Sequence, residues 1–162
     1  MTIDLQRFCA DEETDPRPYL WKPWSRSAYT YASNAKILVR VPRLSDVAEN
    51  DKVPAADKLM EDTKTGEWMP VPIIAAPVTA NCKTCHGRGN HECSCGDAHE
   101  CGTCKGEGTV INTDWSATDV GNAKFANCYL ALIQGWEIAP NGNEPAPIRC
   151  GEAEGLLMPM SK

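Results

Sequence analysis

Two copies of one short pattern of cysteines and glycines lie in the middle of the chain. Residues 82–89 read Cys-Lys-Thr-Cys-His-Gly-Arg-Gly, and residues 101–108 read Cys-Gly-Thr-Cys-Lys-Gly-Glu-Gly. Each copy offers two thiols separated by two residues, which one tight turn can direct at a single metal ion. Four thiolates held in this way are typical of a tetrahedral structural zinc site. We therefore expect one Zn2+ held by Cys82, Cys85, Cys101 and Cys104.

Two other uses of these cysteines fit the sequence less well. A redox dithiol is usually a single Cys-x-x-Cys at the start of a helix, whereas the motif here is duplicated and followed by glycines. A disulfide framework is typical of short secreted chains, but this chain has 162 residues and an odd number of cysteines, nine. The sequence also opens without the basic and apolar stretches of a secretory signal. These features favour metal binding.

A second set of metal-ligating residues lies between the two copies, where residues 91–99 read His-Glu-Cys-Ser-Cys-Gly-Asp-Ala-His. Cys93 and Cys95, joined by His99 and then His91, would complete a Cys2His2 set of a kind that zinc accepts. The alternative is a plain hairpin turn with both thiols reduced and facing solvent, because Cys-x-Cys is a tighter ligand step than Cys-x-x-Cys. The sequence leaves one or two zinc ions open. We expect His86 to be exposed.

The repeated Cys-x-x-Cys-x-Gly-x-Gly pattern resembles the cysteine-rich zinc region of the DnaJ family of co-chaperones. The resemblance covers residues 82–108. The family carries four such repeats and this sequence has two, and the His-Pro-Asp tripeptide of the family's J-domain does not occur in it. The resemblance therefore implies a zinc-binding hairpin and not a co-chaperone.

The distribution of charge bears on the kind of partner. The chain carries a net charge of −6, and residues 45–81 contain seven acidic against three basic side chains. Residues 82–110 contain four acidic and three basic side chains before any thiolate is counted. Zinc fingers that bind nucleic acid usually present a basic patch, because phosphate contacts release counterions and supply much of the affinity. The charge disfavours nucleic acid as a partner and favours a basic protein.

Enzymatic activity is not expected. All three histidines lie within residues 82–108, so no Ser-His-Asp set can be assembled from the rest of the chain. A closed shell of four sulfurs also leaves no coordination position for a substrate or water. Cys9, Cys128 and Cys150 lie outside the metal-binding stretch, and we expect them to be buried apolar thiols.

The sequence also bears on location. No apolar run reaches eighteen residues, so no membrane span is expected. Cysteines available as thiols favour a reducing compartment, and we expect a cytoplasmic protein.

The elements before and beside the metal-binding stretch are expected to be mostly strands. Residues 28–34 and 35–41, rich in Tyr, Ile and Val around a polar turn, predict a β-hairpin. Residues 69–78 carry prolines every few positions and predict an extended segment or an edge strand, because proline cannot donate to a ladder. Residues 108–112 predict a strand on the far side. The metal-binding stretch would then be a hairpin whose two stems pair.

The carboxy-terminal third predicts one main helix followed by three strands. Asn122 can cap a helix over 122–134, and Gly135 stands where it would end. One face of that helix would carry Phe125, Cys128, Tyr129, Leu132 and Ile133. Strands are expected over 136–139, 146–150 and 156–160, with turns at 141–142 and 151–155. Shorter helices are expected over 2–10, capped by Thr2, and over 55–60.

These patterns indicate an α+β protein with one inserted module. We expect a small mixed or antiparallel sheet, formed by residues 1–80 and 109–162, with one main carboxy-terminal helix. The inserted zinc-binding β-hairpin would span residues 81–108.

Two passages of the expected body resemble a domain of the bacterial DNA polymerase sliding clamp. Residues 129–160 have a helix carrying a Tyr-Leu step, then strands, then a closing Met-Pro-Met, and residues 29–41 have Ser-Asn-Ala where the family turns its inner hairpin. A cysteine-rich insert in such a body is similar in layout to small phage and prophage proteins. A clamp lines its hole with basic helices, whereas residues 122–134 contain Lys124 as their one basic residue. The resemblance implies a clamp-like fold and not a ring around DNA.

The sequence as a whole predicts a non-enzymatic, phage-type zinc protein whose hairpin contacts a protein partner of basic character. The alternative is a nucleic-acid-binding accessory protein related to replication clamps. Retention on DNA or RNA at low ionic strength distinguishes the two hypotheses.

Overall fold

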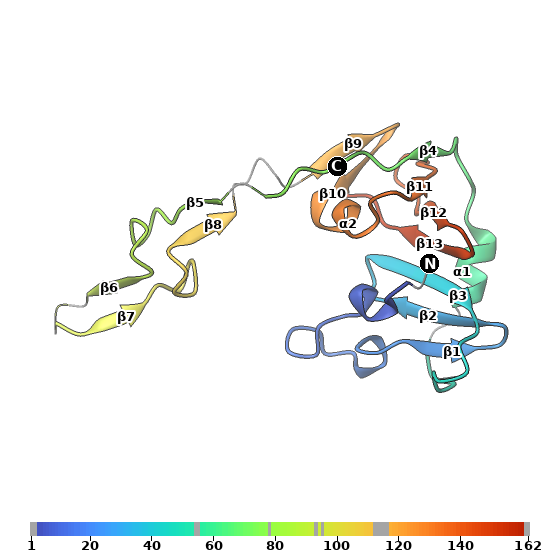
Figure 1. Cartoon of the computed structure of the whole chain (residues 1–162), viewed down its shortest axis with the longest axis horizontal. Coiled ribbons are helices and arrows are strands. Elements are labelled where there is room, and N and C mark those ends of the chain that lie inside the picture. The colour runs from blue at the N-terminus through green and yellow to red at the C-terminus, as the bar shows by residue number, and fades with distance from the viewer. Residues whose placement is uncertain are drawn as a thin grey trace. The chain divides into compact units, whose positions relative to one another are not determined.

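The computed structural model describes residues 3–53, 56–77, 79–92, 94, 96–111 and 117–160. The chain forms two compact units (Figure 1). One consists of Met1–Ile74 with Thr118–Lys162, and we call it the body; the other is Ala75–Ala117, which we call the cysteine module. Neither helix in the described part of the chain has the length and apolar character of a membrane-spanning segment.

The body is organised around one seven-stranded antiparallel sheet with the order β1-β2-β3-β13-β12-β11-β4. Its strands are β1 (Trp24–Arg26), β2 (Tyr29–Ser33), β3 (Ile37–Pro42), β4 (Met69–Pro70), β11 (Glu137–Ile138), β12 (Ala146–Cys150) and β13 (Ala153–Leu157). Two short helices, α1 (Ala56–Asp62) and α2 (Asn127–Leu132), complete the α+β fold that the sequence predicts. Strand β4 lies at an edge of the sheet, where a proline such as Pro70 is tolerated because one side of the strand pairs with no other.

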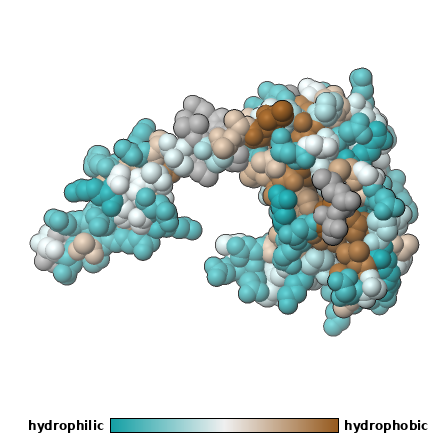
Figure 2. All heavy atoms as spheres, viewed as in Figure 1, coloured by the Kyte–Doolittle hydropathy of each residue, from teal (hydrophilic) through white to brown (hydrophobic). Residues whose placement is uncertain are grey.

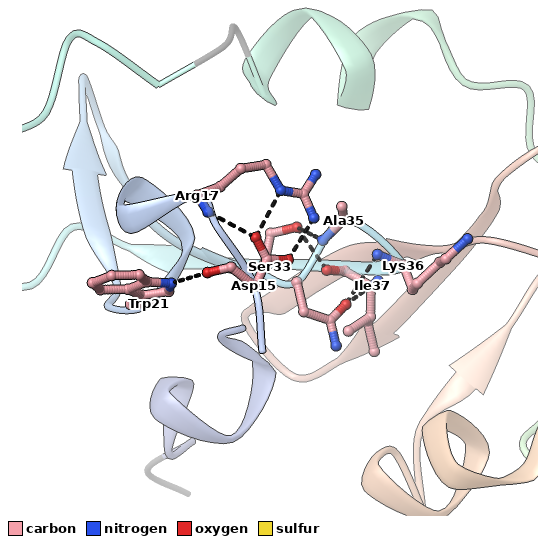
Figure 3. A network of polar contacts seen from close by, with 8 residues as sticks. Asp15, Arg17, Trp21, Ser33, Ala35, Lys36 and Ile37 are labelled. Carbon is pink, nitrogen blue, oxygen red and sulfur yellow. Dashed lines mark hydrogen bonds and ion pairs between the residues drawn. The ribbon is translucent and has the colours of Figure 1, made fainter. Parts of the chain in front are cut away.

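The β2–β3 hairpin is confirmed, and side chains of its own turn hold it closed (Figure 3). The carboxamide oxygen of Asn34 accepts the backbone N–H groups of Lys36 and Ile37 at 2.9 and 3.0 Å. The Ser33 hydroxyl donates to the carbonyl of Ile37 at 2.8 Å and accepts the N–H of Ala35 at 3.0 Å. These bonds satisfy the backbone while Ala35 takes a left-handed conformation with φ 70. The register of β2 on β3 is therefore set locally.

Both faces of the sheet are covered, because alternate residues of the central strands enter two different cores. The alternating pairs are Tyr31 with Ala32 on β2, Leu38 with Val39 on β3, and Leu156 with Leu157 on β13. The larger core also contains Phe125, Leu130 and Ile138, each fully buried. The smaller core contains Trp24, Val53 and Ala56.

The last strand differs from its predicted position. Strand β13 begins at Ala153, three residues earlier than the predicted strand, and Gly155, expected in a turn, lies inside it. A Cβ on Gly155 would lie 2.1 Å from the carbonyl oxygen of Leu38 on the neighbouring strand. The glycine is therefore needed where two backbones approach closely, and the turn is confined to the residues just after Cys150.

The predicted helix over 122–134 is wrong in its first half. A two-stranded hairpin, β9 (Ala117–Val120) and β10 (Ala123–Ala126), precedes the six-residue helix α2. Gly121, with φ 58, and Asn122 form the turn of that hairpin, and the Asn122 side chain accepts the N–H of Gly142 at 2.9 Å instead of capping a helix. Phe125 reaches the core from a strand in which buried and exposed residues alternate.

The amino-terminal helix expected over 2–10 is a single 3-10 turn, η1 (Leu5–Phe8). Its cap is Asp4, whose carboxylate accepts the N–H of Gln6 at 3.1 Å; the expected cap, Thr2, lies outside the described residues. A second 3-10 turn, η2, spans Pro18–Leu20. Beside it, the Arg17 guanidinium makes two bonds to the Asp15 carboxylate at 2.9 and 2.6 Å (Figure 3).

Candidate metal centre

The cysteine module consists of two short antiparallel ladders with the cysteine repeats between them (Figure 1). The stem ladder pairs β5 (Thr79–Asn81) with β8 (Thr109–Ile111), and the tip ladder pairs β6 (Asn90–Glu92) with β7 (Ala98–Glu100). Each eight-residue repeat begins directly after one ladder and ends directly before the other. The sequence predicted paired stems and located the second one, but the first stem is Thr79–Asn81 and not the predicted segment 69–78, of which Met69–Pro70 pairs with β11 in the body. Because β5 pairs with β8, backbone hydrogen bonds hold the two ends of the metal-binding stretch together.

The two repeats are related by an approximate twofold arrangement of hydrogen bonds. The N–H of Cys82 donates to the carbonyl of Gly108, and the N–H of Cys101 donates to the carbonyl of Gly89, both at 2.8 Å. The first cysteine of each repeat is thus bonded to the last glycine of the other. The hydroxyls of Thr84 and Thr103, at equivalent positions, lie 3.0 Å apart.

The last glycine of each repeat also donates to a sulfur. The N–H of Gly89 lies 3.2 Å from Sγ of Cys85, and the N–H of Gly108 lies 3.2 Å from Sγ of Cys104. A hydrogen bond to sulfur favours the thiolate over the neutral thiol. The sequence analysis did not predict this role of the second glycine. The signal was present, since both copies carry glycine at the same position.

These two glycines also lie where no larger residue fits. Gly89 and Gly108 have φ values of 77 and 75. A Cβ on Gly89 would lie 2.2 Å from the carbonyl oxygen of Gly106, and one on Gly108 would lie 2.4 Å from that of Gly87. The two turns therefore pack backbone against backbone.

The four sulfurs lie at the separations that a tetrahedral metal requires. Sγ of Cys82 is 3.8 Å from Sγ of Cys101, Sγ of Cys85 is 3.7 Å from Sγ of Cys104, and all four lie within 4.8 Å of one another. With Zn–S bonds of about 2.3 Å, the edge of an ideal tetrahedron is about 3.8 Å. All four cysteines are buried. The arrangement can hold one metal ion, such as zinc, in a closed shell of four sulfurs.

The four thiols do not share one pKa. Hydrogen bonding from the backbone of Cys85 lowers the pKa of Cys82 to about 6, and the backbone of Cys104 likewise lowers the pKa of Cys101. Burial raises the pKa of Cys104 to about 11. Four thiolates so close together need a cation, and binding one must displace the remaining protons.

The second set of predicted ligands is described only in part. His91 and His99 are directly opposite each other in the tip ladder, and both are exposed. Cys93 and Cys95 lie outside the described residues. His86 is exposed, as expected.

The thiols outside the metal-binding stretch are less buried than expected. Cys9 and Cys150 are partly buried, and Cys128 is exposed. The expectation for Cys128 assumed that it shared the core face of a long helix. Because α2 begins only at Asn127, Cys128 lies in its first turn on the solvent side.

No protein family, curated protein or solved structure was found to match the chain. The resemblances to the DnaJ zinc region and to the clamp domain therefore rest on the residue patterns alone.

Proposed function

We propose that the four cysteines hold one structural Zn2+ and that the cysteine module is a non-enzymatic binding module for a protein partner. The observation that carries this proposal is the content of the module's interior. Its buried cluster consists of Cys82, Cys85, Cys101 and Cys104, with the partly buried Val110 packed against it. Such an interior supplies little hydrophobic stabilisation, so metal binding must supply most of the folding free energy.

The ladders around the cysteines support a role in contact rather than in catalysis. Every residue of β5, β6 and β7 is exposed. Figure 2 shows mostly hydrophilic and intermediate residues over this module on the visible face. A zinc ion bound by four buried sulfurs has no open position at which to polarise a substrate or activate water. By binding cysteines of both repeats, the metal would hold the backbone of the module rigid, with polar side chains exposed on its ladders.

The charge of the displayed side chains favours a basic partner. Among the exposed residues of 82–108, four are acidic, Glu92, Asp97, Glu100 and Glu107, and three are basic, Lys83, Arg88 and Lys105. Four thiolates and one Zn2+ add a net charge of −2 at the centre of the module. Complementary charge speeds encounter and selects partners. A phosphate backbone would instead be repelled.

The wider proposal is a phage-type protein with a clamp-like body. It is supported by the two passages that resemble a clamp domain, because both belong to one sheet in which β3 pairs with β13. Placement in the cytoplasm, where thiols stay reduced, belongs to the same proposal.

Metal analysis of freshly purified, reduced protein tests the first half of the proposal. The expected result is at least one equivalent of zinc, lost in Cys101→Ser, while the exposed Cys128→Ser retains it. The near-ultraviolet circular dichroism of the body should survive in both variants. Less than one equivalent of zinc in the unmodified protein would contradict the proposal.

Binding to a panel of basic and acidic peptides at several salt concentrations tests the second half. Salt-sensitive binding of basic peptides is expected, weakened by the charge reversals Glu92→Lys and Glu107→Lys and not weakened by Lys105→Gln, which removes a positive charge. Retention of the zinc-loaded protein on DNA or RNA at low ionic strength, with no peptide bound, would instead support a nucleic-acid accessory protein.

A further inference from the structure

Two histidines lie directly opposite each other in the tip ladder. His91 on β6 and His99 on β7 are partners in the antiparallel register, so both side chains leave the same face of the ladder. Directly opposite residues have Cβ atoms about 4.5–5.5 Å apart. Imidazole side chains extending from such positions can bring one nitrogen each to a shared ion with Zn–N bonds of about 2.0–2.1 Å.

The ladder that carries this pair is held in place from its base. Cys101, two residues after His99, is bonded through its N–H to the carbonyl of Gly89, two residues before His91. The same two repeats hold the four-sulfur centre. The spacing of the two imidazole positions is therefore set before any second ion arrives, which lowers the entropic cost of binding it.

The surroundings favour a cation. Both histidines are exposed, so a hydrated ion can reach them without a conformational change. Residues 90–100 contain three acidic side chains and no lysine or arginine, so the tip is negatively charged, although the side chains of Glu92 and Glu100 leave the opposite face of the ladder. Neutral imidazole suits Zn2+, Ni2+ and Cu2+, whereas Mg2+ and Ca2+ prefer sets of oxygen ligands.

We propose that His91 and His99 form a second, surface site for a borderline divalent cation, distinct from the buried four-sulfur centre. Two imidazoles supply two ligands, and water or a partner's side chain completes the shell. The site is weaker than the buried one because it has fewer ligands and they are hydrated before binding. It leaves coordination positions open, which the four-sulfur centre does not, so it can bridge the module to a ligating group on another molecule.

The test begins with protein that holds one equivalent of zinc, so that failure of the first centre is seen separately. Equilibrium dialysis against added Zn2+ is expected to show a second equivalent binding more weakly. His91→Gln and His99→Gln should each weaken that second event by about tenfold or more, since loss of even an outer-shell partner costs about that much. His86→Gln removes an exposed imidazole of the same module and should leave the second event unchanged. Imidazole nitrogen resonances of two histidines, and not of the third, should shift on addition of the second equivalent.

The proposal is overturned if the unmodified protein binds no second equivalent, or if it binds one with equal affinity in both histidine variants. Cys93 and Cys95 occur between the two strands in the sequence, and the double variant Cys93→Ser/Cys95→Ser separates a thiol site from an imidazole site. Loss of the second event in that variant, with retention in His91→Gln and His99→Gln, would likewise overturn it.

Discussion

Replacing Gly89 by alanine should weaken zinc binding without touching a ligand. The substitution places a methyl group at φ 77, where an L-residue costs about 1–2 kcal/mol. The same methyl would lie 2.2 Å from the carbonyl oxygen of Gly106, so one repeat must move away from the other by more than an ångström. A forced displacement of packed backbone costs about 1–3 kcal/mol more.

Together these effects amount to about 2–5 kcal/mol, or zinc affinity reduced roughly 30- to 4,000-fold if zinc binding and folding of the module are one process. Competition with a chromophoric chelator measures this change directly. Two glycines of the same module serve as matched controls. Gly96 has φ 85 with no described atom within 4 Å of its Cβ position, and Gly102 has neither a positive φ nor a close neighbour in the described part of the chain.

Gly96→Ala should therefore reduce zinc affinity by no more than about 30-fold, the effect of the backbone conformation alone. Gly102→Ala should have almost no effect. The order Gly89 > Gly96 > Gly102 separates close packing between the repeats from backbone conformation. Equal zinc affinities of the Gly89→Ala and Gly102→Ala variants would refute the packing geometry on which the reasoning depends.

Three further predictions concern the two units separately. Phe125→Ala should destabilise the body by about 3–5 kcal/mol in denaturant unfolding, because the side chain is fully buried, and should leave zinc content unchanged. Iodoacetamide at about pH 8 should modify the exposed Cys128 much faster than Cys9, whose pKa burial raises to about 11; comparable rates by peptide mass spectrometry would contradict this. Zinc affinity should fall as pH falls. Cys104, with its pKa raised to about 11, must release a proton at neutral pH, and Cys82 takes one up below its pKa of about 6, so chelator competition should show a steeper loss below that pH.

Local sequence patterns correctly predicted the elements whose limits are set by nearby residues. The β2–β3 hairpin follows from two runs of β-branched and aromatic residues and a turn whose Ser33 and Asn34 side chains bond the adjacent backbone. Strand β12 spans 146–150, as the sequence predicts. Both require few interactions with distant parts of the chain to set their limits.

The region around Phe125 was mispredicted because its apolar spacing fits two structures. The residues from 125 to 133 follow helical spacing, while 123–126 also alternate between buried and exposed. The Gly121-Asn122 pair is a two-residue turn signal, although asparagine is also a common helix cap. The large core decides between the two, since Phe125 reaches it from a strand and Leu130 from a helix.

At the candidate metal centre, the sequence predicts both the type and the spacing of the ligands. The affinity of thiolates for zinc is a property of the side chains themselves, and two residues between cysteines fit a single turn. The contacts between the repeats were not readable in the same way. The hydrogen bonds that join Cys82 to Gly108 and Cys101 to Gly89 connect residues far apart in sequence.

The sequence by itself determined which four residues can share a metal ion, the acidic character of the stretch around them, and the α+β class of the body. Only the tertiary structure decided that the cysteines form nearly the whole interior among the described residues of their module, that Gly89 and Gly108 must have no side chain, and that His91 lies opposite His99. The reason is physical. Chemical type and local turn geometry are carried by neighbouring residues, whereas burial, close backbone approach and strand register depend on groups that meet only when the chain has folded.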